Sequence, residues 1–295
     1  MSILNQFIMQ IFNGINIGSI YALIALGYTM VYGIAKLINF AHGDIIMVGA
    51  YVCYFMIKTF NLPVYVAILI SIVTCIILGI TIERVAYKPL RSASRITLLI
   101  TAIGMSYLLQ SSFQLMFTSN PRPYPAIIDL PALKLGNLTI SSNYYITFVV
   151  SVILMVLLNV FIQKTKTGKA MRAVSEDQGA AMLMGIDINK TISIKFAIGS
   201  GLAAIAGILY CASYPVVSPY IGSLPGIKAF IAAVLGGIGS IPGAVLGAFI
   251  LGMIETFTKA YISSQLSDAI VFIVLILMLV FKPQGILGKN VKEKV

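Results

Sequence analysis

Three polar residues close together near the start of the sequence could contact a ligand. Asn39, His42 and Asp44 lie in the stretch INFAHGD, between two apolar runs. Their amide, imidazole and carboxylate groups can hydrogen-bond a solute, but they can equally cap the helix that follows or lie at a membrane interface. Polar groups at the ends of membrane spans are common and cost little, so we favour the structural role and keep ligand binding as the alternative.

A lone acid, Glu255, lies inside an apolar run. Ionisable residues at membrane depth are functional candidates by default. Lys259 follows one helical turn later, in the favourable acid-first order, so we expect an ion pair between the two. The pair either lies at the membrane interface, which is the simpler interpretation, or belongs to a transport pathway. Lys195 and Lys228 are most simply lysines that extend to the interface, and Glu83 an interface anchor.

A glycine- and proline-rich stretch, GGIGSIPGAVLG, interrupts the apolar sequence at residues 236–247. Non-helical backbone at membrane depth persists only where it is buried in protein or lines a water-filled cavity. Discontinuous helices of this type recur in transporters. The stretch therefore predicts either a tight corner between two helices or a gate beside a pathway, and the two weigh about equally. The candidate residues are Gly237, Gly239, Pro242 and Gly243.

The sequence carries no pattern typical of an enzyme. It has one histidine and contains no GxxxxGK[ST], HExxH or GxSxG motif. The three cysteines stand alone in apolar surroundings, without the spacing of a metal or redox site. We therefore expect no catalytic centre, no cofactor and no metal, and no ATP bound through a P-loop.

Membrane-spanning helices must position these residues. Hydrophobic residues make up 59% of the 295, charged residues only 10%, and the mean hydropathy is +0.99; soluble domains carry about 25% charged residues. Apolar runs near 20 residues recur along the chain, which is the length of a spanning helix. We predict an all-α, polytopic transmembrane protein with one domain over residues 1–295, about eight spans and a possible half-span. The expected spans cover residues 7–34, 44–57, 64–82, 97–117, 144–163, 192–214, 244–257 and 269–281, with the half-span at 226–243.

The distribution of basic residues predicts the orientation. The net charge is +11, but the lysines and arginines cluster in a few short loops, as expected for loops on the cytoplasmic side. Loop 83–95, segment 164–191 and the C-terminal tail are therefore assigned to the cytoplasm, and the proline-rich loop 118–143 to the outside. This pattern argues against nucleic acid as the partner of the positive charge.

The polar segment 164–191 predicts a cytoplasmic contact element. Good helix formers dominate residues 169–184, Gly185 is suited to end a helix, and Asp187 and Asn189 offer caps for the next one. A half-apolar helix held between two spans is suited to touch a partner protein. The apolar residues expected to share one face are Met171, Val174, Ala181 and Met184.

Five segments together resemble the H-type permease subunit of ABC importers for branched-chain amino acids (the LivH family). The resemblance extends over nearly the whole chain, and the combination of segments is specific. The segments are GSIYALIALGYTMVYGIAKLINFAHGD (18–44), ERVAYKPLR (83–91), RAVSEDQGAAMLMGID (172–187), SPYIG (218–222) and AVLGGIGSIPGAVLGAFILGMIET (233–256).

The resemblance implies a multi-pass permease of the bacterial cytoplasmic (inner) membrane. It also implies a second related permease subunit, two cytoplasmic ATP-binding subunits that hydrolyse ATP, and an extracytoplasmic substrate-binding protein that delivers leucine, isoleucine or valine. Importer permeases of this superfamily dock on the ATPase through an EAA---G loop; here residues 179–185 read GAAMLMG, with glycine in place of the glutamate. The residues expected to couple to the ATPase are Arg172, Glu176, Asp177, Ala180, Ala181, Met184 and Gly185.

The mechanism expected from this arrangement is a lever. ATP binding and hydrolysis in the partner chains would move helix 169–184, and the adjoining spans would pass the motion to a pathway. One alternative is a permease for another small solute, such as urea, an amide or a sugar. Another is a stand-alone ion- or proton-coupled transporter, for which only Glu255 and Asp44 could couple the ion. A receptor or scaffold lacks the expected soluble domain.

Overall fold

The chain is described here from a computed structural model, over residues 3–35, 39–91, 93–135 and 138–288. Eleven α-helices account for most of these ranges, and four very short strands form two antiparallel pairs, β1 with β4 and β2 with β3. The fold is therefore almost, but not entirely, helical. The helices are α1 (Ile3–Ala35), α2 (His42–Lys58), α3 (Val64–Ile82), α4 (Arg95–Phe117), α5 (Ser142–Lys164), α6 (Lys166–Glu176), α7 (Gln178–Leu183), α8 (Ile188–Ser213), α9 (Ser223–Gly236), α10 (Ile241–Tyr261) and α11 (Ser267–Phe281). The strands are β1 (Arg122–Pro123), β2 (Leu133–Leu135), β3 (Leu138–Ile140) and β4 (Val216–Val217).

Six helices in the described ranges are long and apolar enough to cross a membrane, so the chain is a multi-pass membrane protein. They lie within α1, α3 with its continuation to Leu90, α4, α5, α8 and α10. Helix α2 has 17 residues and α11 has 15, shorter than the roughly 20 residues of an upright span. A total of eight spans therefore stays a prediction.

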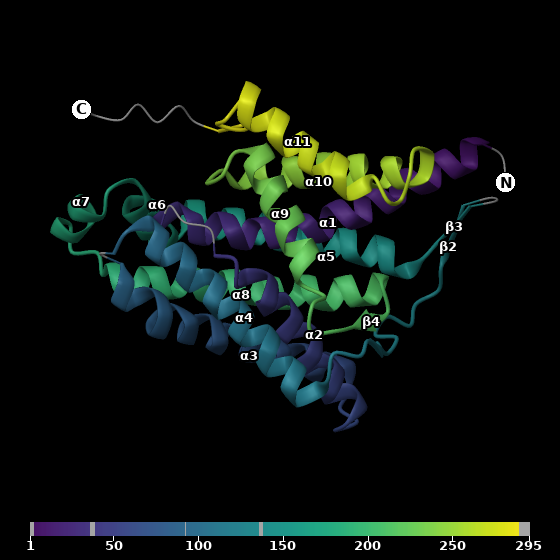
Figure 1. The fold of residues 1–295 in the computed structure, drawn as a ribbon, viewed down its shortest axis with the longest axis horizontal. Helices are drawn as coiled ribbons and strands as arrows, with labels where there is room; N and C mark the ends of the chain where they lie inside the picture. The colour runs from purple at the N-terminus through teal and green to yellow at the C-terminus, as the bar shows by residue number, and fades with distance from the viewer. Residues whose placement is uncertain (1–2, 36–38, 92, 136–137, 289–295) are drawn as a thin grey trace.

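Helix α9, the expected half-span, has 14 residues and is about 21 Å long at 1.5 Å per residue. It is nearly all buried, and Figure 1 shows it at a steep angle to α1 and α10 rather than alongside them. The helical pair α6–α7 projects at one end of the molecule, and the short strands lie at the other. The predicted short apolar helix after the sixth expected span is thus present as α9, and it crosses the bundle at an angle to the neighbouring helices.

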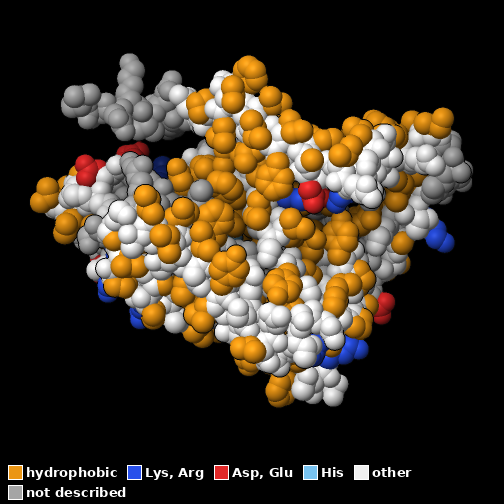
Figure 2. Space-filling view, viewed as in Figure 1, with side chains coloured by type: hydrophobic (Ala, Val, Ile, Leu, Met, Phe, Trp, Pro, Cys, Tyr) orange, Lys and Arg blue, Asp and Glu red, His pale blue; other side chains and the backbone are white. Residues whose placement is uncertain are grey.

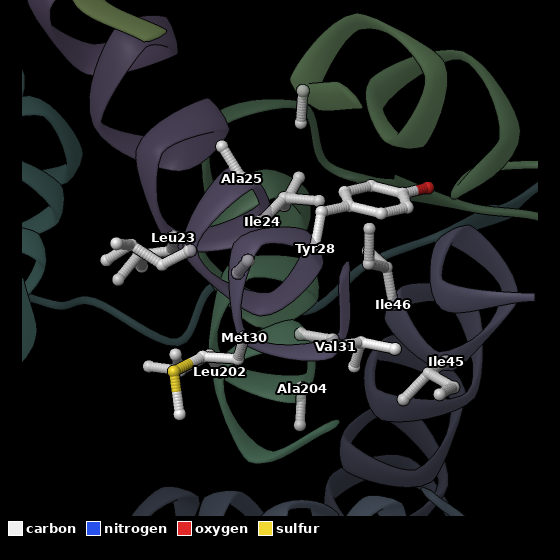
Figure 3. Packing of buried hydrophobic residues seen from close by; sticks show 14 of the residues in the cluster. Leu23, Ile24, Ala25, Tyr28, Met30, Val31, Ile45, Ile46, Leu202 and Ala204 are labelled. Carbon is white, nitrogen blue, oxygen red and sulfur yellow. The ribbon is translucent and has the colours of Figure 1, made fainter. Parts of the chain in front are cut away.

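The core lies where α1, α2 and α8 meet, and Figure 3 shows its buried apolar side chains. Glycines let these helices approach closely. The spacing of Gly14 and Gly18 predicts tight packing of α1, and both lie against α10: a Cβ on Gly14 would come within 2.5 Å of Met253 Sδ, and one on Gly18 within 2.9 Å of Phe249. On the other side of the core, a Cβ on Gly207 of α8 would lie 2.3 Å from the carbonyl oxygen of Ile46 in α2.

We expect Gly207→Ala to destabilise the protein and Gly104→Ala to leave it unchanged or slightly more stable. The first methyl group meets a backbone carbonyl that cannot rotate away, and overpacking of this kind costs about 1–3 kcal/mol. A Cβ on Gly104, in α4, meets nothing within 4 Å, and alanine is the better helix former by about 0.5–1 kcal/mol. Thermal unfolding of the two purified variants in detergent compares them. Equal unfolding temperatures would show that the α2–α8 contact is not tight.

Candidate functional site

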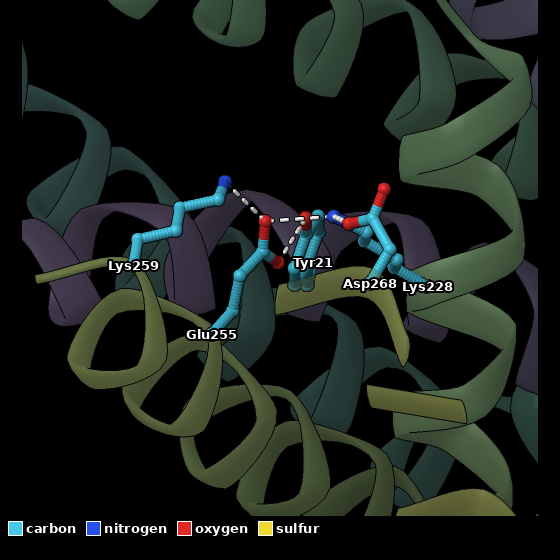
Figure 4. Close-up of polar contacts among 5 residues, drawn as sticks. All are labelled: Tyr21, Lys228, Glu255, Lys259 and Asp268. Carbon is cyan, nitrogen blue, oxygen red and sulfur yellow. Dashed lines mark hydrogen bonds and ion pairs between the residues drawn. The ribbon is translucent and has the colours of Figure 1, made fainter. Parts of the chain in front are cut away.

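Glu255 is the centre of a buried network of charged and polar side chains. Its Oε1 accepts from Lys259 Nζ at 2.5 Å and from Lys228 Nζ at 2.7 Å, and its Oε2 accepts from the Tyr21 hydroxyl at 2.7 Å. Lys228 Nζ also lies 2.6 Å from Asp268 Oδ1. Figure 4 shows the five side chains, which come from α1, α9, α10 and α11, with Lys259 and Asp268 at the two ends of the row. The predicted pair of Glu255 with Lys259 is thus confirmed, and it is part of a larger network.

The network corrects the interpretation of Lys228 as a lysine that extends to the interface. The Lys228 side chain is only 7% exposed, and Glu255 only 2%. Charges buried to this degree persist only when they are paired and hydrogen-bonded. Here the partners come from four helices that meet at Glu255. Asp268, by contrast, is 46% exposed. Figure 2 shows a small group of acidic and basic side chains surrounded by apolar surface beside α10 and α11.

Two adjoining cavities open beside the network. One of about 230 Å³ is lined by Tyr21, Lys228, Glu255 and Asp268 together with apolar side chains. The other, of about 340 Å³, is lined by ends of α1, α5, α8 and α10. They share Ile17, Tyr214 and Lys259, so the two cavities are neighbours, at the end of the molecule opposite α6–α7. Of the predicted site residues, Glu255 alone lies here.

Asn39, His42 and Asp44 are buried in the protein rather than placed at an interface. They are 2%, 1% and 2% exposed. Ala41 is the N-cap of α2 and no side chain caps this helix, so the expected capping role is wrong. Their partners come from other elements: Tyr87 OH donates to Asn39 Oδ1 at 2.8 Å, and Gln110 Nε2 donates to Asp44 Oδ1 at 2.8 Å. His42 packs its ring edge-on against Tyr28, with centroids 4.7 Å apart.

The glycine- and proline-rich stretch forms a tight corner between α9 and α10. Gly237 and Gly239 have φ of +105° and +95°, a region open to glycine at little cost. Ser240 caps α10 by accepting from Gly243 N at 3.2 Å, with Pro242 in the first turn. Residues 286 and 287 donate backbone hydrogen bonds to the carbonyl oxygens of residues 235 and 236 and so cover the corner. A gating role for these glycines stays a prediction.

The expected single helix over residues 169–184 is two helices, α6 and α7, that meet at Asp177. The carboxylate of Asp177 accepts from Ala180 N at 2.9 Å, and this N-cap starts a new helix. Gly185 has φ +77° as expected for a residue that ends a helix, and Asp187 caps α8 by accepting from Lys190 N at 3.0 Å. Asn189 does not act as a cap: it accepts from Arg91 Nη1 at 2.6 Å.

The break redistributes the residues that were expected to share one apolar face. Met171, Val174 and Ala181 are buried, whereas Met184 is 82% exposed. With Met182 and Leu183, at 63% and 91%, it forms an apolar tip at the end of α7. The other predicted contact residues, Arg172, Glu176, Asp177 and Ala180, are exposed. The apolar tip is therefore the part of this segment that is open to a partner.

Buried polar contacts link α6 to α8, and α8 to the end of α3. Lys195 is 4% exposed and donates to Ser175 Oγ at 2.6 Å, so it does not extend to an interface as expected. Glu83 is fully buried in a π-helix (Glu83–Tyr87) that continues α3, where it pairs with Arg91 and accepts from Ser193 Oγ at 2.7 Å. Segments of π-helix occur frequently at functional sites. An acid at the start of a basic loop, with Arg84 and Arg91 after it, was the sequence signal for this cluster.

Comparison with known proteins gives a match over almost the whole chain. The family model described as "Branched-chain amino acid transport system / permease component" matches residues 10–279. The high-affinity branched-chain amino acid transport system permease protein LivH of Escherichia coli K12 is 42% identical over 98% of both chains. The corresponding protein BraD of Pseudomonas aeruginosa is 43% identical, also over 98% of both.

A solved structure supports the fold. The complex PsaBC from Streptococcus pneumoniae with a Fab contains a chain that superposes with a TM-score of 0.51 at 12% identity, over 93% of this chain and 91% of that one. At this identity the likeness concerns the fold alone. The family match and the two full-length relatives decide the assignment: this chain belongs to the family of branched-chain amino acid transport system permease components.

Proposed function

We propose that this chain is the membrane-spanning permease subunit of an ATP-driven importer for branched-chain amino acids in the bacterial cytoplasmic (inner) membrane. The observation that carries the proposal is the match of 98% of the chain, at 42–43% identity, to permeases of high-affinity branched-chain amino acid systems. The multi-pass helical fold is of the kind that this role needs.

The proposed importer contains a second related permease, two cytoplasmic ATP-binding subunits and an extracytoplasmic substrate-binding protein. The sequence has no P-loop, so in an ATP-driven importer the free energy of ATP enters this chain through contacts with another subunit. Three adjacent apolar side chains are exposed at the tip of α7. An exposed apolar patch of this kind is typical of a surface that a partner protein covers. Segment 164–191 is accordingly the proposed coupling element, on the cytoplasmic side by its positive charge.

Motion of this element would reach the middle of the bundle through the contacts at its base. Gly168 of α6 packs so closely on α5 that a Cβ would lie 2.4 Å from two carbonyl oxygens. Lys195 then links α6 to α8, and Ser193 of α8 links to Glu83. The π-helix that holds Glu83 also holds Tyr87, which bonds Asn39 just before α2. Two packed helices, rather than one lever, would therefore move together with α8 and the start of α2.

The test is to co-express the chain with candidate partner subunits, purify the complex and measure uptake of radiolabelled L-leucine into proteoliposomes. We expect an ATPase and a second permease to co-purify, and uptake to require both ATP and the binding protein. Isoleucine and valine should compete with leucine, whereas urea and sugars should not. Uptake by the isolated chain, driven by an ion gradient without an ATPase, would replace the proposal with a secondary transporter.

A further inference from the structure

We propose that the 230 Å³ cavity beside Glu255 binds a zwitterionic amino acid with a branched apolar side chain. The inference rests on the proposed function and goes further, because it names the residues that hold the substrate. In this site Lys259 and Asp268 bind the two charges of the head group, and the apolar wall of the cavity receives the side chain.

The position of the cavity suits the first contact with an arriving substrate. The adjoining 340 Å³ cavity is lined by Tyr144 at the start of α5, Ser213 at the end of α8 and Ala260 at the end of α10. This end lies opposite the α6–α7 pair, which is the proposed cytoplasmic end. A substrate released outside would therefore meet the end of the molecule at which these two cavities lie.

The charges of the network match those of a zwitterion. Lys259 is 39% exposed and, in the described part of the chain, donates only to Glu255, so two of its three N–H groups can donate to a carboxylate. Asp268 uses Oδ1 for Lys228 and is 46% exposed, which leaves Oδ2 to accept from an ammonium group. The buried Glu255 and Lys228 stand between these two and hold them in place, as Figure 4 shows.

The rest of the wall is apolar and of suitable size. Ile17, Ile20, Leu224 and Pro225 line it together with the rings of Tyr210 and Tyr214. A cavity of about 150 Å³ with apolar walls binds benzene, so 230 Å³ holds a branched side chain together with its head group. A few placed polar groups in an apolar pocket are the usual composition of a small-molecule site.

Protection of an introduced cysteine tests the site without relying on transport. Ser264 lines the cavity and is exposed, whereas the native cysteines Cys53, Cys75 and Cys211 are all buried. In the complete purified complex carrying Ser264→Cys, we expect L-leucine to slow reaction with a thiol reagent. At a concentration tenfold above the dissociation constant the rate should fall about tenfold, because only the unoccupied fraction reacts. Leucinamide lacks the carboxylate and 4-methylpentanoate lacks the ammonium group, so neither should protect.

A matched pair of substitutions separates the site from a general structural effect. Asp268→Asn in the Ser264→Cys background keeps the shape of the side chain but removes its charge, and should abolish protection by leucine. Asp129→Asn makes the same change at an exposed aspartate in the loop between α4 and α5, and should leave protection intact. Equal protection in the two variants would overturn the inference.

The remaining outcomes separate this inference from the proposed function. If leucine fails to slow labelling in a complex that still imports leucine with ATP, the site is wrong and the function stands. If leucine protects but the complex shows no ATP-driven uptake, the function is wrong and the site stands. Protection by 4-methylpentanoate as strong as that by leucine would reduce the site to an apolar cavity and would overturn the assignment of the head group.

Discussion

Glu255→Gln is expected to lower the free energy of unfolding by about 3–5 kcal/mol, the usual effect of removing one partner of a buried ion pair. The substitution keeps the shape of the side chain but removes the negative charge that accepts from Lys228, Lys259 and the Tyr21 hydroxyl. Lys228, only 7% exposed, is then left with the half-exposed Asp268 as its counter-charge. Thermal unfolding of the purified protein in detergent measures the loss.

Two comparisons show whether the pairing causes the loss. Glu176→Gln makes the same change at an exposed position in α6 and should alter stability by no more than about 0.5 kcal/mol. The double variant Glu255→Gln with Lys228→Met should lose less stability than the two single variants together. In the double variant neither buried charge of this pair remains without its partner. An unfolding temperature of Glu255→Gln equal to that of Glu176→Gln would mean that the network contributes nothing to stability.

Much of the helical architecture could be predicted from the apolar runs alone. The run at residues 64–82 coincides with α3, and the runs at 97–117 and 192–214 lie within three or four residues of α4 and α8. The reason is physical: backbone groups inside a bilayer must bond within their own helix, so the length of an apolar run fixes the length of the helix. The exceptions are helices short enough to lie across the bundle, as α9 does.

The site was less accessible to prediction because its contacts join distant parts of the chain. Lys259 could be paired with Glu255 because the two share one face of a helix, four residues apart. Lys228 comes from α9, Asp268 from the start of α11 and Tyr21 from α1. Nothing in the local sequence states that α9 crosses α1 and α10 at the level of Glu255. The one available signal was Lys228, which lies in an apolar helix too short to span the membrane. Such a lysine is equally consistent with a side chain that extends to the membrane interface.

Local chemistry also decided where the coupling element breaks. Good helix formers dominate residues 169–184, which favours one helix, but Asp177 competes as an N-cap because its short carboxylate accepts from a backbone N–H three residues on. The break turns residues 182–184 outward, away from the buried Ala181. The exposed apolar residues 182–184 thus depend on the N-cap at Asp177, which ends one helix and starts the next. A helical projection of the sequence assumes one continuous helix and so does not show this break.

Leu183→Asp is expected to reduce leucine uptake by the assembled importer about tenfold or more while leaving the fold intact. Its side chain is 91% exposed, so the change costs little stability in the isolated chain. In the proposed complex the same side chain is covered by the ATP-binding subunit, and placing a carboxylate in an apolar contact opposes binding. Residues at the centre of an interface contribute about 2 kcal/mol or more when they are hot spots, and each 1.4 kcal/mol is about tenfold in affinity.

Leu130→Asp is the matched control, because Leu130 is 55% exposed and belongs to the loop between α4 and α5, whose strands β2 and β3 lie at the opposite end of the molecule from α7. It should leave co-purification of the ATP-binding subunit unchanged. Leu183→Asp should reduce both that co-purification and the stimulation of ATP hydrolysis by the loaded binding protein, with the unfolding temperature of the permease unaltered. Because stability and assembly are measured separately, a folding defect cannot imitate the result. Should Leu183→Asp retain full assembly and full uptake, the α7 tip does not contact the ATP-binding subunit, and the free energy of ATP must enter this chain elsewhere.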